Sequence, residues 1–340
     1  MTPNSQIAVV ILNYNGVHFL KQFLPNILQQ STDANVYVID NGSNDGSYEY
    51  LKSLTNLSII RSENNLGYTG GYNFGLKQLN EPYWVLINSD IEVTNGWLSA
   101  PIELLKNNHQ IAVCQPKLLD LKQRTKFEYA GAAGGFIDFY GYPFCKGRLF
   151  EALEEDNNQY NTTDEIFWAS GACLFIKSTV FKEVGGFDEH YFAHMEEIDL
   201  CWRIKNRGYK VMFEPKSTVY HLGGGTLNKA NPKKTYLNFR NNLSTILKNH
   251  PSKFVFFIIK FRLFLDGIAA LKFLLEGYPS LVWQVLKAHL VFYSWIPRLL
   301  KERRLQSKNK TSSNDATFFK GNVVWRYFVK KQRTYSELIK

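Results

Sequence analysis

The chain has 340 residues, of which 45% are hydrophobic, 15% aromatic and 21% charged, so it can bury a large core and cannot be disordered throughout. The net charge of +10 hides a split: residues 1–200 carry 13 Lys and Arg against 24 Asp and Glu, whereas residues 201–340 carry 27 against 6. The four cysteines are scattered without a C-x-x-C pair, which argues against a disulfide framework or a zinc knuckle.

The first hundred residues alternate between strand and helix patterns. Residues 7–15, IAVVILNYN, form a continuous apolar run that is typical of a parallel strand buried on both faces. The elements expected next are a helix over 18–30 that Pro25 kinks or restarts, a strand beginning at 35, a helix over 47–54, a strand over 57–65, a helix over 70–79 and a strand over 83–90. This order predicts a doubly wound α/β sheet.

Each expected strand ends in polar residues. These are Asn13 and Asn15, Asp40 and Asn41, Asn64 and Asn65, and Asn88 and Asp90. Ligands bind at the carboxyl ends of the strands in such sheets. The pattern therefore predicts a polar crevice along this edge rather than a sealed core.

Two aspartates and a glycine cluster are the candidates for ligand binding at this edge. Asp40 either caps the next helix or, if Asp45 does so, accepts hydrogen bonds from a nucleobase. Asp90 either caps a turn or binds a divalent cation through oxygen. The glycines that begin at Gly67 match neither the dinucleotide fingerprint nor the P-loop, so they make a tight turn or let backbone approach a bound nucleotide or sugar.

Seven motifs occur in order between about residues 6 and 245. They are VVILNYNG, VIDNGSNDGS, NNLGYTGGYNFG, LINSDIEV, SGACLFIKSTVFKEVGGFDEHYF, HMEEIDLCWRIKNRGYKV and VYHLGGGT. Together they resemble family 2 glycosyltransferases of the GT-A fold, closest to the rhamnosyltransferase-like and galactofuranosyltransferase-like branch. The resemblance implies a mixed sheet flanked by helices that binds a nucleotide-diphosphate sugar.

The resemblance also implies the donor and metal residues. Asp40 would contact the base, Asn13 would lie beside the nucleoside, and the donor site would further include Gly67, Asn73, Asn88 and Asp90. Asn88–Ser89–Asp90 stands where the family has its D-x-D motif, with Asn in the first position. Binding of Mn²⁺ or Mg²⁺ would therefore rest mainly on Asp90, together with His221.

An acidic cluster is expected to carry the chemistry. Glu196, Glu197 and Asp199 fall at a helix start, where the helix dipole alone would favour them. The resemblance makes Glu197 the base of an inverting transfer, and Glu196 and Asp199 orient the acceptor. The acceptor site would also include Gly171, which leaves room for a sugar, and Trp168, which either stacks on the sugar or is a core aromatic.

The expected division is a catalytic domain over 1–245 (nucleotide-binding to about 100, acceptor-binding from 101), an amphipathic helical region over 246–306, and a basic linker and tail over 307–340. Arg262, Asp266, Lys272 and Glu276 fall on one side of a helix, with Lys260 opposite them. This helix either packs on the catalytic domain or lies in the plane of an anionic membrane surface. Its longest uncharged runs are too short to span a bilayer.

The expected function is inverting transfer of a sugar from dTDP-rhamnose or a UDP-sugar to a glycan or lipid-linked glycan in cell-surface polysaccharide synthesis. The N-terminus lacks a signal-peptide pattern, so we expect a cytoplasmic protein, peripheral on the inner face of the cell membrane, with no nucleic-acid partner. Two alternatives remain: a nucleotidyltransferase, and a non-catalytic basic protein that binds membranes or nucleic acid.

Overall fold

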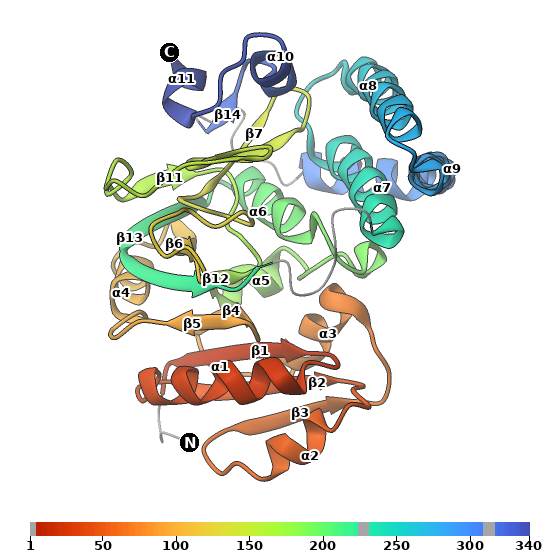
Figure 1. Ribbon diagram of the computed structural model, residues 1–340. Helices are drawn as coiled ribbons and strands as arrows, with labels where there is room; N and C mark the ends of the chain where they lie inside the picture. The colour runs from red at the N-terminus through yellow and green to blue at the C-terminus, as the bar shows by residue number, and fades with distance from the viewer. Residues whose placement is uncertain (1–4, 224–230, 309–316) are drawn as a thin grey trace.

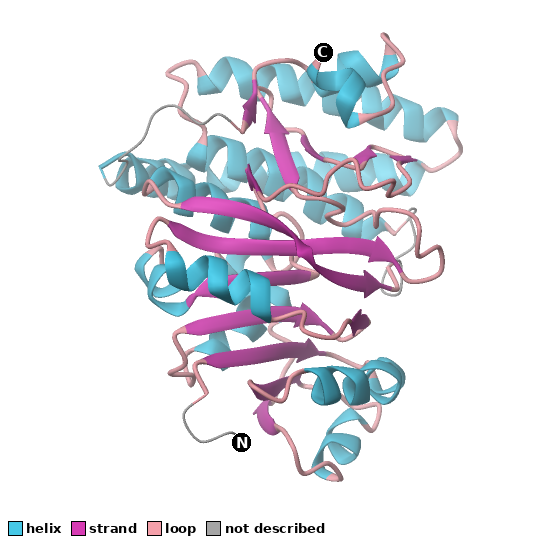
Figure 2. Cartoon of the chain, turned by 90° about the vertical axis from the view of Figure 1, so that its left-hand side faces the viewer, coloured by secondary structure: helices cyan, strands magenta, loops and turns pink. Residues whose placement is uncertain are grey.

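The computed structural model describes residues 5–223, 231–308 and 317–340. In the described chain a large nine-stranded sheet runs through the centre and a smaller five-stranded sheet lies above it (Figure 1). Helices α7 (Pro232–Asn249), α8 (Val255–Leu275) and α9 (Pro279–Lys308) stand together at one side. Figure 2 shows the strands of the large sheet side by side across the molecule, with helices in front of and behind them.

The large sheet has the strand order β11-β13-β6-β12-β4-β1-β2-β3, with β5 paired to β13. Its strands are β1 (Ile7–Asn13), β2 (Asn35–Asn41), β3 (Ser58–Ser62), β4 (Tyr83–Asn88), β5 (Ile91–Val93), β6 (Ile111–Asp120), β11 (Asp164–Ile166), β12 (Cys173–Lys177) and β13 (Lys210–His221). Strands β1 to β4 are mutually parallel, whereas β12 runs antiparallel to β4 and β6. The expected mixed α/β sheet is therefore confirmed.

Helices cover both faces of this sheet. They are α1 (Val17–Gln30), α2 (Ser47–Lys52), α3 (Gly67–Leu76), α4 (Ser99–Asn107), α5 (Ser178–Glu183) and α6 (Glu196–Asn206), with a short 3₁₀ turn, η1 (Glu189–Tyr191). Helix α1 is a single helix that contains Pro25, so the expected restart does not occur. The buried Leu20, Phe23, Leu24 and Ile27 anchor it on both sides of that proline.

The smaller sheet joins the middle of the chain to its C-terminal segment. Its strands are β7 (Gly135–Asp138), β8 (Pro143–Cys145), β9 (Arg148–Leu149), β10 (Ala152–Leu153) and β14 (Phe318–Phe319). Helices α10 (Val323–Phe328) and α11 (Tyr335–Ile339) follow, and the N–H of Val323 donates to the Asp138 carboxylate at 2.9 Å. Residues 317–340, expected as tail, are thus packed on the catalytic domain, and most of the expected linker, 309–316, lies outside the described residues.

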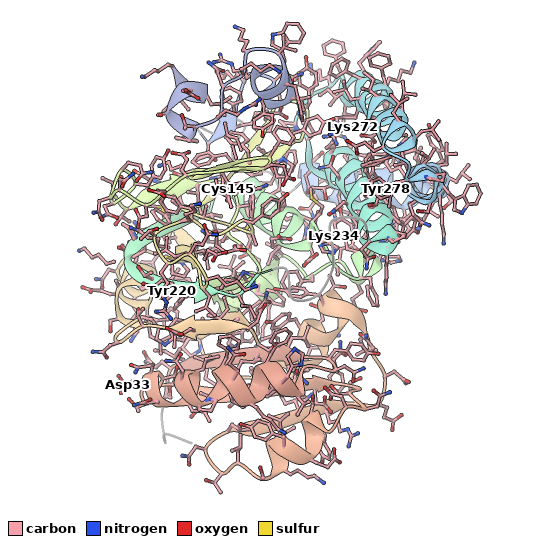
Figure 3. All side chains as sticks on the ribbon, in the orientation of Figure 1. Asp33, Cys145, Tyr220, Lys234, Lys272 and Tyr278 are labelled. Carbon is pink, nitrogen blue, oxygen red and sulfur yellow. The ribbon has the colours of Figure 1, made fainter. Side chains whose placement is uncertain are left out.

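Helices α7 (Pro232–Asn249), α8 (Val255–Leu275) and α9 (Pro279–Lys308) form the helical extension. The described part of the chain contains no helix that is both long and apolar enough to span a membrane. Lys272, near the C-terminal end of α8, and Tyr278, which follows this helix, lie on the side of the molecule where α8 meets α9 (Figure 3). The carboxyl ends of β1 and β13 point toward the same side (Figure 1).

Helix α8 packs with Arg262 and Asp266 inward and its apolar face outward, whereas Lys272 and Glu276 of the same expected stripe are exposed. Arg262 and Asp266 are buried, Arg262 stacks on the Tyr142 ring at 3.5 Å, and Asp266 lies 3.1 Å from His289 of α9. On the opposite side Phe257 is 68% exposed and Leu275 is 80% exposed. This arrangement is the reverse of the usual one for a helix on the surface of a soluble protein.

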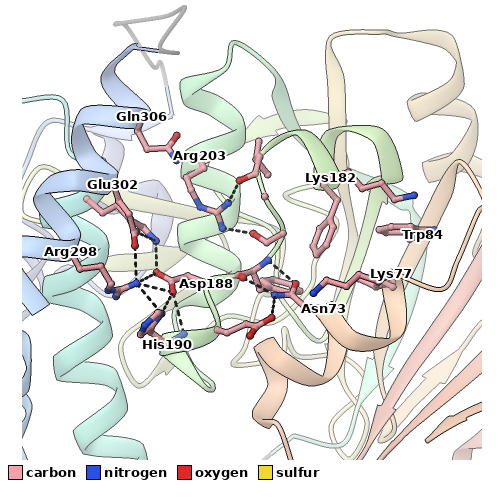
Figure 4. A pocket seen from close by; sticks show the side chains of 18 residues that line it. Asn73, Lys77, Trp84, Lys182, Asp188, His190, Arg203, Arg298, Glu302 and Gln306 are labelled. Atoms are coloured by element: carbon pink, nitrogen blue, oxygen red, sulfur yellow. Dashed lines mark hydrogen bonds and ion pairs between the residues drawn. The ribbon is translucent and has the colours of Figure 1, made fainter. Parts of the chain in front are cut away.

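A buried ion network holds α9 against the catalytic domain, beside a cavity of about 650 Å³ (Figure 4). Asp188 lies 2.9 Å from the Lys248 ammonium and 3.1 Å from the Arg298 guanidinium, and Arg298 also contacts Glu302. Burial opposes ionisation, but these two cations lower the pKa of Asp188 below its usual range. The network ties the helical extension to the loop that precedes α6.

Candidate active site

The antiparallel pairing of β5 with β13 creates the first corner of the site. Ile91 lies opposite His221 in this pairing, so Asp90 and His221 meet although 131 residues separate them. His221 Nε2 is 3.1 Å from Asp90 Oδ1 and 3.5 Å from Asn88 Nδ2. The three residues expected at the metal and phosphate end of the donor site therefore lie together.

Glu128 completes this corner and was missed by the sequence analysis. Its Oε1 is 3.2 Å from His221 Nδ1, and both side chains are buried. Burial lowers the pKa of His221, but Glu128 and Asp90 outweigh burial and raise that pKa to about 10. No motif surrounds Glu128, which follows β6 in an irregular segment, so only the packing of the chain identifies it.

This donor set fits a divalent cation. A metal-bound histidine usually offers its second ring nitrogen to a carboxylate, which is the relation between His221 and Glu128. Within the described ranges, no group of three or more His, Cys, Asp and Glu side chains is arranged to hold a metal. Two protein ligands, Asp90 and His221, would thus leave the other positions to phosphate oxygens and water, as Mg²⁺ commonly requires.

The ends of β1 and β2 form a second corner with unsatisfied acceptors. Asn13 pairs with Asp40 in the parallel register, and the Asp40 side chain is 0% exposed. Neither Asp40 carboxylate oxygen nor Asn13 Oδ1 accepts a hydrogen bond in the described structure, although the Arg61 guanidinium lies 3.4 Å from Asp40. Buried acceptors without donors are costly, so this corner is suited to a ligand that brings N–H or O–H groups.

Asp45 takes the local structural role that would otherwise compete for Asp40. Its carboxylate accepts from the backbone N–H of Ser47 at 3.0 Å and of Val17 at 2.9 Å, which fixes the starts of α2 and α1. Asp40 therefore does not cap the helix, and its carboxylate remains available to a ligand. This is the second of the two alternatives that the sequence left open.

Gly67 and Asn73 contact the loop that precedes α6. Gly67 has a φ of +73°, and a Cβ there would lie 2.7 Å from the Phe192 carbonyl oxygen, so only glycine fits. The same carbonyl accepts from the N–H of Tyr68 at 2.7 Å. Asn73 exchanges hydrogen bonds with the Phe187 backbone at 2.9 and 3.0 Å. Their role in donor binding stays a prediction.

Glu196 and Glu197 form the acidic corner at the start of α6. Each has one carboxylate oxygen, Oε2, that is buried without a hydrogen-bond partner. Burial raises the pKa of Glu197 to about 7, and burial together with the neighbouring Glu197 raises the pKa of Glu196 well above its usual value. A carboxyl of this pair whose pKa lies near neutrality can accept a proton from a hydroxyl group.

Tyr68 links the acidic corner to Gly171. Its hydroxyl donates to the Gly171 carbonyl at 2.9 Å, and a Cβ on Gly171 would lie 4.0 Å from the Glu197 Cβ. Burial, Tyr72 and the two glutamates raise the pKa of Tyr68 well above its usual value. Gly171, Glu196 and Glu197 are thus neighbours, as expected, and Tyr68 is a further polar group there that the motif NNLGYTGG contained but did not single out.

Asp199 and Trp168 are engaged within the protein. Asp199 accepts from Arg203 at 2.8 Å and from Asn249 at 2.7 Å, and lies 2.9 Å from the Lys248 ammonium. Trp168 is 3% exposed, and its indole N–H donates to a backbone carbonyl at 2.9 Å. Their surroundings match the structural alternatives for both residues, and their contact with an acceptor stays a prediction.

Helix α7 holds the backbone of the loop before α6. The buried Asn241 amide donates to the carbonyls of Tyr191, Ala193 and His194 at 3.1, 2.9 and 2.7 Å. In that loop Phe192, His194 and Met195 have positive φ values of 65°, 69° and 71°. Such conformations cost about 1–3 kcal/mol each for residues other than glycine, so surrounding contacts must maintain them. Asn241 therefore positions the helix that carries Glu196 and Glu197.

Comparison with known proteins now identifies the family. The model of "Glycosyl transferase family 2" matches residues 8–185, just over half of the chain. The chain belongs to glycosyl transferase family 2. The matched range contains the first corner except for His221, and it contains the whole second corner. It ends before Glu196 and Glu197 of the acidic corner.

Two curated relatives extend the likeness of this family 2 protein beyond residue 185. One is the N-acetylglucosaminyl-diphospho-decaprenol L-rhamnosyltransferase of Mycobacterium tuberculosis, 25% identical over 267 residues, which are 74% of this chain and 83% of the relative. The other is the low-salt glycan biosynthesis hexosyltransferase Agl10 of Haloferax volcanii, 24% identical over 71% of this chain and 75% of the relative. These likenesses support a glycosyltransferase over the two alternatives above.

Solved structures confirm the GT-A fold. TarS of S. aureus, residues 1–349 in complex with UDP-GlcNAc, gives a TM-score of 0.54 at 17% identity and covers 89% of this chain and 86% of its own. The mannosyltransferase PcManGT of Pyrobaculum calidifontis, in complex with GDP-Man and Mn²⁺, gives 0.52 at 12% identity and covers 89% and 87%.

We expect Asn241→Ala to lower the turnover of glycosyl transfer at least tenfold, because it displaces the start of α6 and with it Glu197, the residue expected to act as the base. The lost hydrogen bonds should also reduce the free energy of unfolding by about 2 kcal/mol. Steady-state kinetics and urea unfolding would measure the two effects, with Asn238→Ala on the same helix as the matched control. A loss of stability with unchanged turnover would show that the contact is only structural.

Proposed function

We propose that this family 2 glycosyltransferase moves a sugar, with inversion, from a nucleotide-diphosphate sugar to a hydroxyl of a glycan or lipid-linked glycan in cell-surface polysaccharide synthesis. The observation that carries the proposal is the Glu196–Glu197 pair at the start of α6, a candidate carboxylate base in which each side chain keeps one buried oxygen without a hydrogen-bond partner. An acceptor hydroxyl needs such a base as it attacks the anomeric carbon.

Glu197 is the proposed base. The acceptor oxygen forms a bond to the anomeric carbon while the bond from that carbon to the diphosphate oxygen breaks on the opposite face. The hydroxyl proton passes to Glu197, and the nucleoside diphosphate leaves with the bonding electron pair. Glu196 and Gly171 contribute to the acceptor site, the former because its protonated carboxyl can donate a hydrogen bond to a sugar oxygen.

The proposed donor is dTDP-rhamnose or a UDP-sugar. The unpartnered acceptors of Asn13 and Asp40 suit the base and sugar hydroxyls of a nucleoside. One relative is named as an L-rhamnosyltransferase, and similar folds were solved with UDP-GlcNAc and with GDP-Man. The Asp40 carboxylate and the Asn13 amide oxygen, side by side, favour a base that offers an N–H.

Asp90 and His221 would hold Mn²⁺ or Mg²⁺, with Glu128 orienting the imidazole. A bound cation would supply charge neutralisation for the diphosphate leaving group. Structures of similar fold were determined with Mn²⁺. Because the imidazole must release its proton to bind a metal, the affinity of this site for the cation should increase with pH.

The proposed location is the inner face of the cell membrane. The support comes from α8, whose aromatic face points away from the protein while its Arg262–Asp266 stripe packs inward. Lys260 is exposed on the outer side, 5.8 Å from the Phe257 ring, and can reach anionic headgroups. An acceptor linked to a lipid would then be presented at the same surface.

Replacing Glu197 by Gln should lower turnover by about 10²–10⁴-fold, because the amide cannot accept the hydroxyl proton. Donor binding should remain nearly intact. In the unchanged protein kcat/KM should fall as the pH drops below about 7, because protonation of Glu197 removes the base. Glu103→Gln, an exposed carboxylate on α4, is the control; normal turnover in Glu197→Gln would contradict the assignment.

A thermal-shift panel would test the donor and metal sites. UDP, dTDP, GDP and their sugars are added with Mn²⁺, Mg²⁺ or chelator to the unchanged protein and to Asp90→Ala. A ligand at a hundredfold its Kd adds about 2.7 kcal/mol of stability. We expect one nucleotide to stabilise the protein only with metal and only when Asp90 is present. Equal stabilisation of Asp90→Ala would overturn the metal site.

The double variant Phe257→Glu/Phe264→Glu should weaken binding to phosphatidylglycerol-rich vesicles at least tenfold, because each buried Phe contributes about 1.5–3 kcal/mol. Co-sedimentation of the full chain measures the partition. Leu153→Glu, on the distant β10, replaces an exposed apolar residue and is the matched control. Equal partition of the double variant and the control would exclude α8 as the membrane contact.

A further inference from the structure

A groove of about 550 Å³ runs between the first turns of α7, the first half of α9 and the loop before α6. This volume is within the range of small-molecule sites. Phe192, Tyr236 and Leu237 give it an apolar lining, and Lys233, Arg240 and Lys287 line it with positive charge. The donor and acceptor roles described above use none of these residues.

The groove has cations without counter-charges. Among the residues that the structure describes, its lining includes no Asp or Glu. Arg240 is 6% exposed, and its guanidinium donates only to neutral groups, namely Asn241, the Tyr236 hydroxyl at 3.1 Å and the carbonyls of His190 and Tyr191. In the described ranges Arg240 makes no ion pair with a carboxylate. A buried charge is normally compensated, so the missing partner indicates an anionic ligand.

The two lysines stand over the aromatic lining. The Lys233 ammonium is 4.3 Å from the centre of the Phe192 ring, and the Lys287 ammonium is 5.1 Å from that of Tyr236. Neither lysine makes a salt bridge to a carboxylate of the described chain. Both ammonium groups are therefore free to turn toward an anion that enters the groove.

The inner end of the groove adjoins the acidic corner. Phe192 lies four residues before Glu196, and its carbonyl accepts from the Tyr68 N–H at 2.7 Å. Tyr68 in turn bonds Gly171, the neighbour of Glu197. The groove is thus connected to the acidic corner through Phe192 and Tyr68.

The outer end of the groove adjoins an apolar surface. Trp283, Leu286 and Leu290, on the same helix as Lys287, are exposed. A hydrocarbon chain leaving the groove would therefore meet apolar side chains and, if the proposed membrane contact holds, the bilayer.

We propose that this groove binds the diphosphate of a polyprenyl-diphosphate-linked acceptor, with Lys233, Arg240 and Lys287 as its counter-charges and the exposed face of α9 beside its hydrocarbon chain. The inference rests on the proposed function, since it names the acceptor class of the same site. A diphosphate matches three converging cations, and a prenyl chain matches the apolar exit.

The test is titration of the full chain with farnesyl diphosphate in the presence of chelator, so that the donor's metal site is not used. We expect Lys233→Ala/Lys287→Ala to bind at least tenfold more weakly than the unchanged protein. Lys301→Ala removes an exposed lysine from α9 and should bind within twofold. Farnesol, which has the chain without the diphosphate, should bind at least tenfold more weakly than farnesyl diphosphate.

Three outcomes would overturn the proposal: equal binding by the double variant, equal binding of farnesol, or loss of farnesyl diphosphate binding in Asp90→Ala, which would place the ligand in the donor site. Because the titration contains no nucleotide, a failure to bind farnesyl diphosphate would not change the result of the thermal-shift panel with nucleotides. Conversely, if no nucleotide stabilised the protein while farnesyl diphosphate still bound the groove, the result would count against the proposed function alone.

Discussion

Hydrogen bonds from α7 to the loop before α6 are the constraint on which the catalytic geometry depends. The Asn241 amide satisfies three carbonyls of that loop, and Arg240 satisfies two. The loop carries three non-glycine residues in the left-handed region, which an isolated chain would leave. The helical extension is therefore part of the active site's support, and the Asp188–Lys248–Arg298 network fixes it from a second direction.

Incomplete charge compensation distinguishes the site from the rest of the core. Asp40, Glu196 and Glu197 keep buried carboxylate oxygens without donors, whereas Asp199 is satisfied by three partners. A protein tolerates unsatisfied acceptors where a ligand supplies the donors, because the cost is then recovered on binding. The same principle applies with opposite sign to the groove, where Arg240 lacks an anion.

The proposed acceptor site and the proposed membrane contact both adjoin the helical extension. The carboxyl ends of β1 and β13 point toward the side on which α7, α8 and α9 stand (Figure 1). The apolar side of α8 faces outward because Arg262 and Asp266 have partners within the protein, Tyr142 and His289. A lipid-linked acceptor would join these two features, since its sugar and its hydrocarbon chain require different surroundings.

The strand-end polar residues, the acidic cluster and the α/β order were readable from the sequence, because periodicity and turn chemistry are local. Asp45 could likewise be expected to relieve Asp40. Local pattern could not reveal Glu128 or Asn241, since no motif marks them and their partners lie far along the chain. Nor could it decide which side of α8 faces the protein, because a charged stripe is ordinarily the wet side. The order of the residues was enough to identify the family and the polar edge of the sheet. Which carboxylates remain unpaired follows from tertiary packing, because pairing depends on contacts between distant segments.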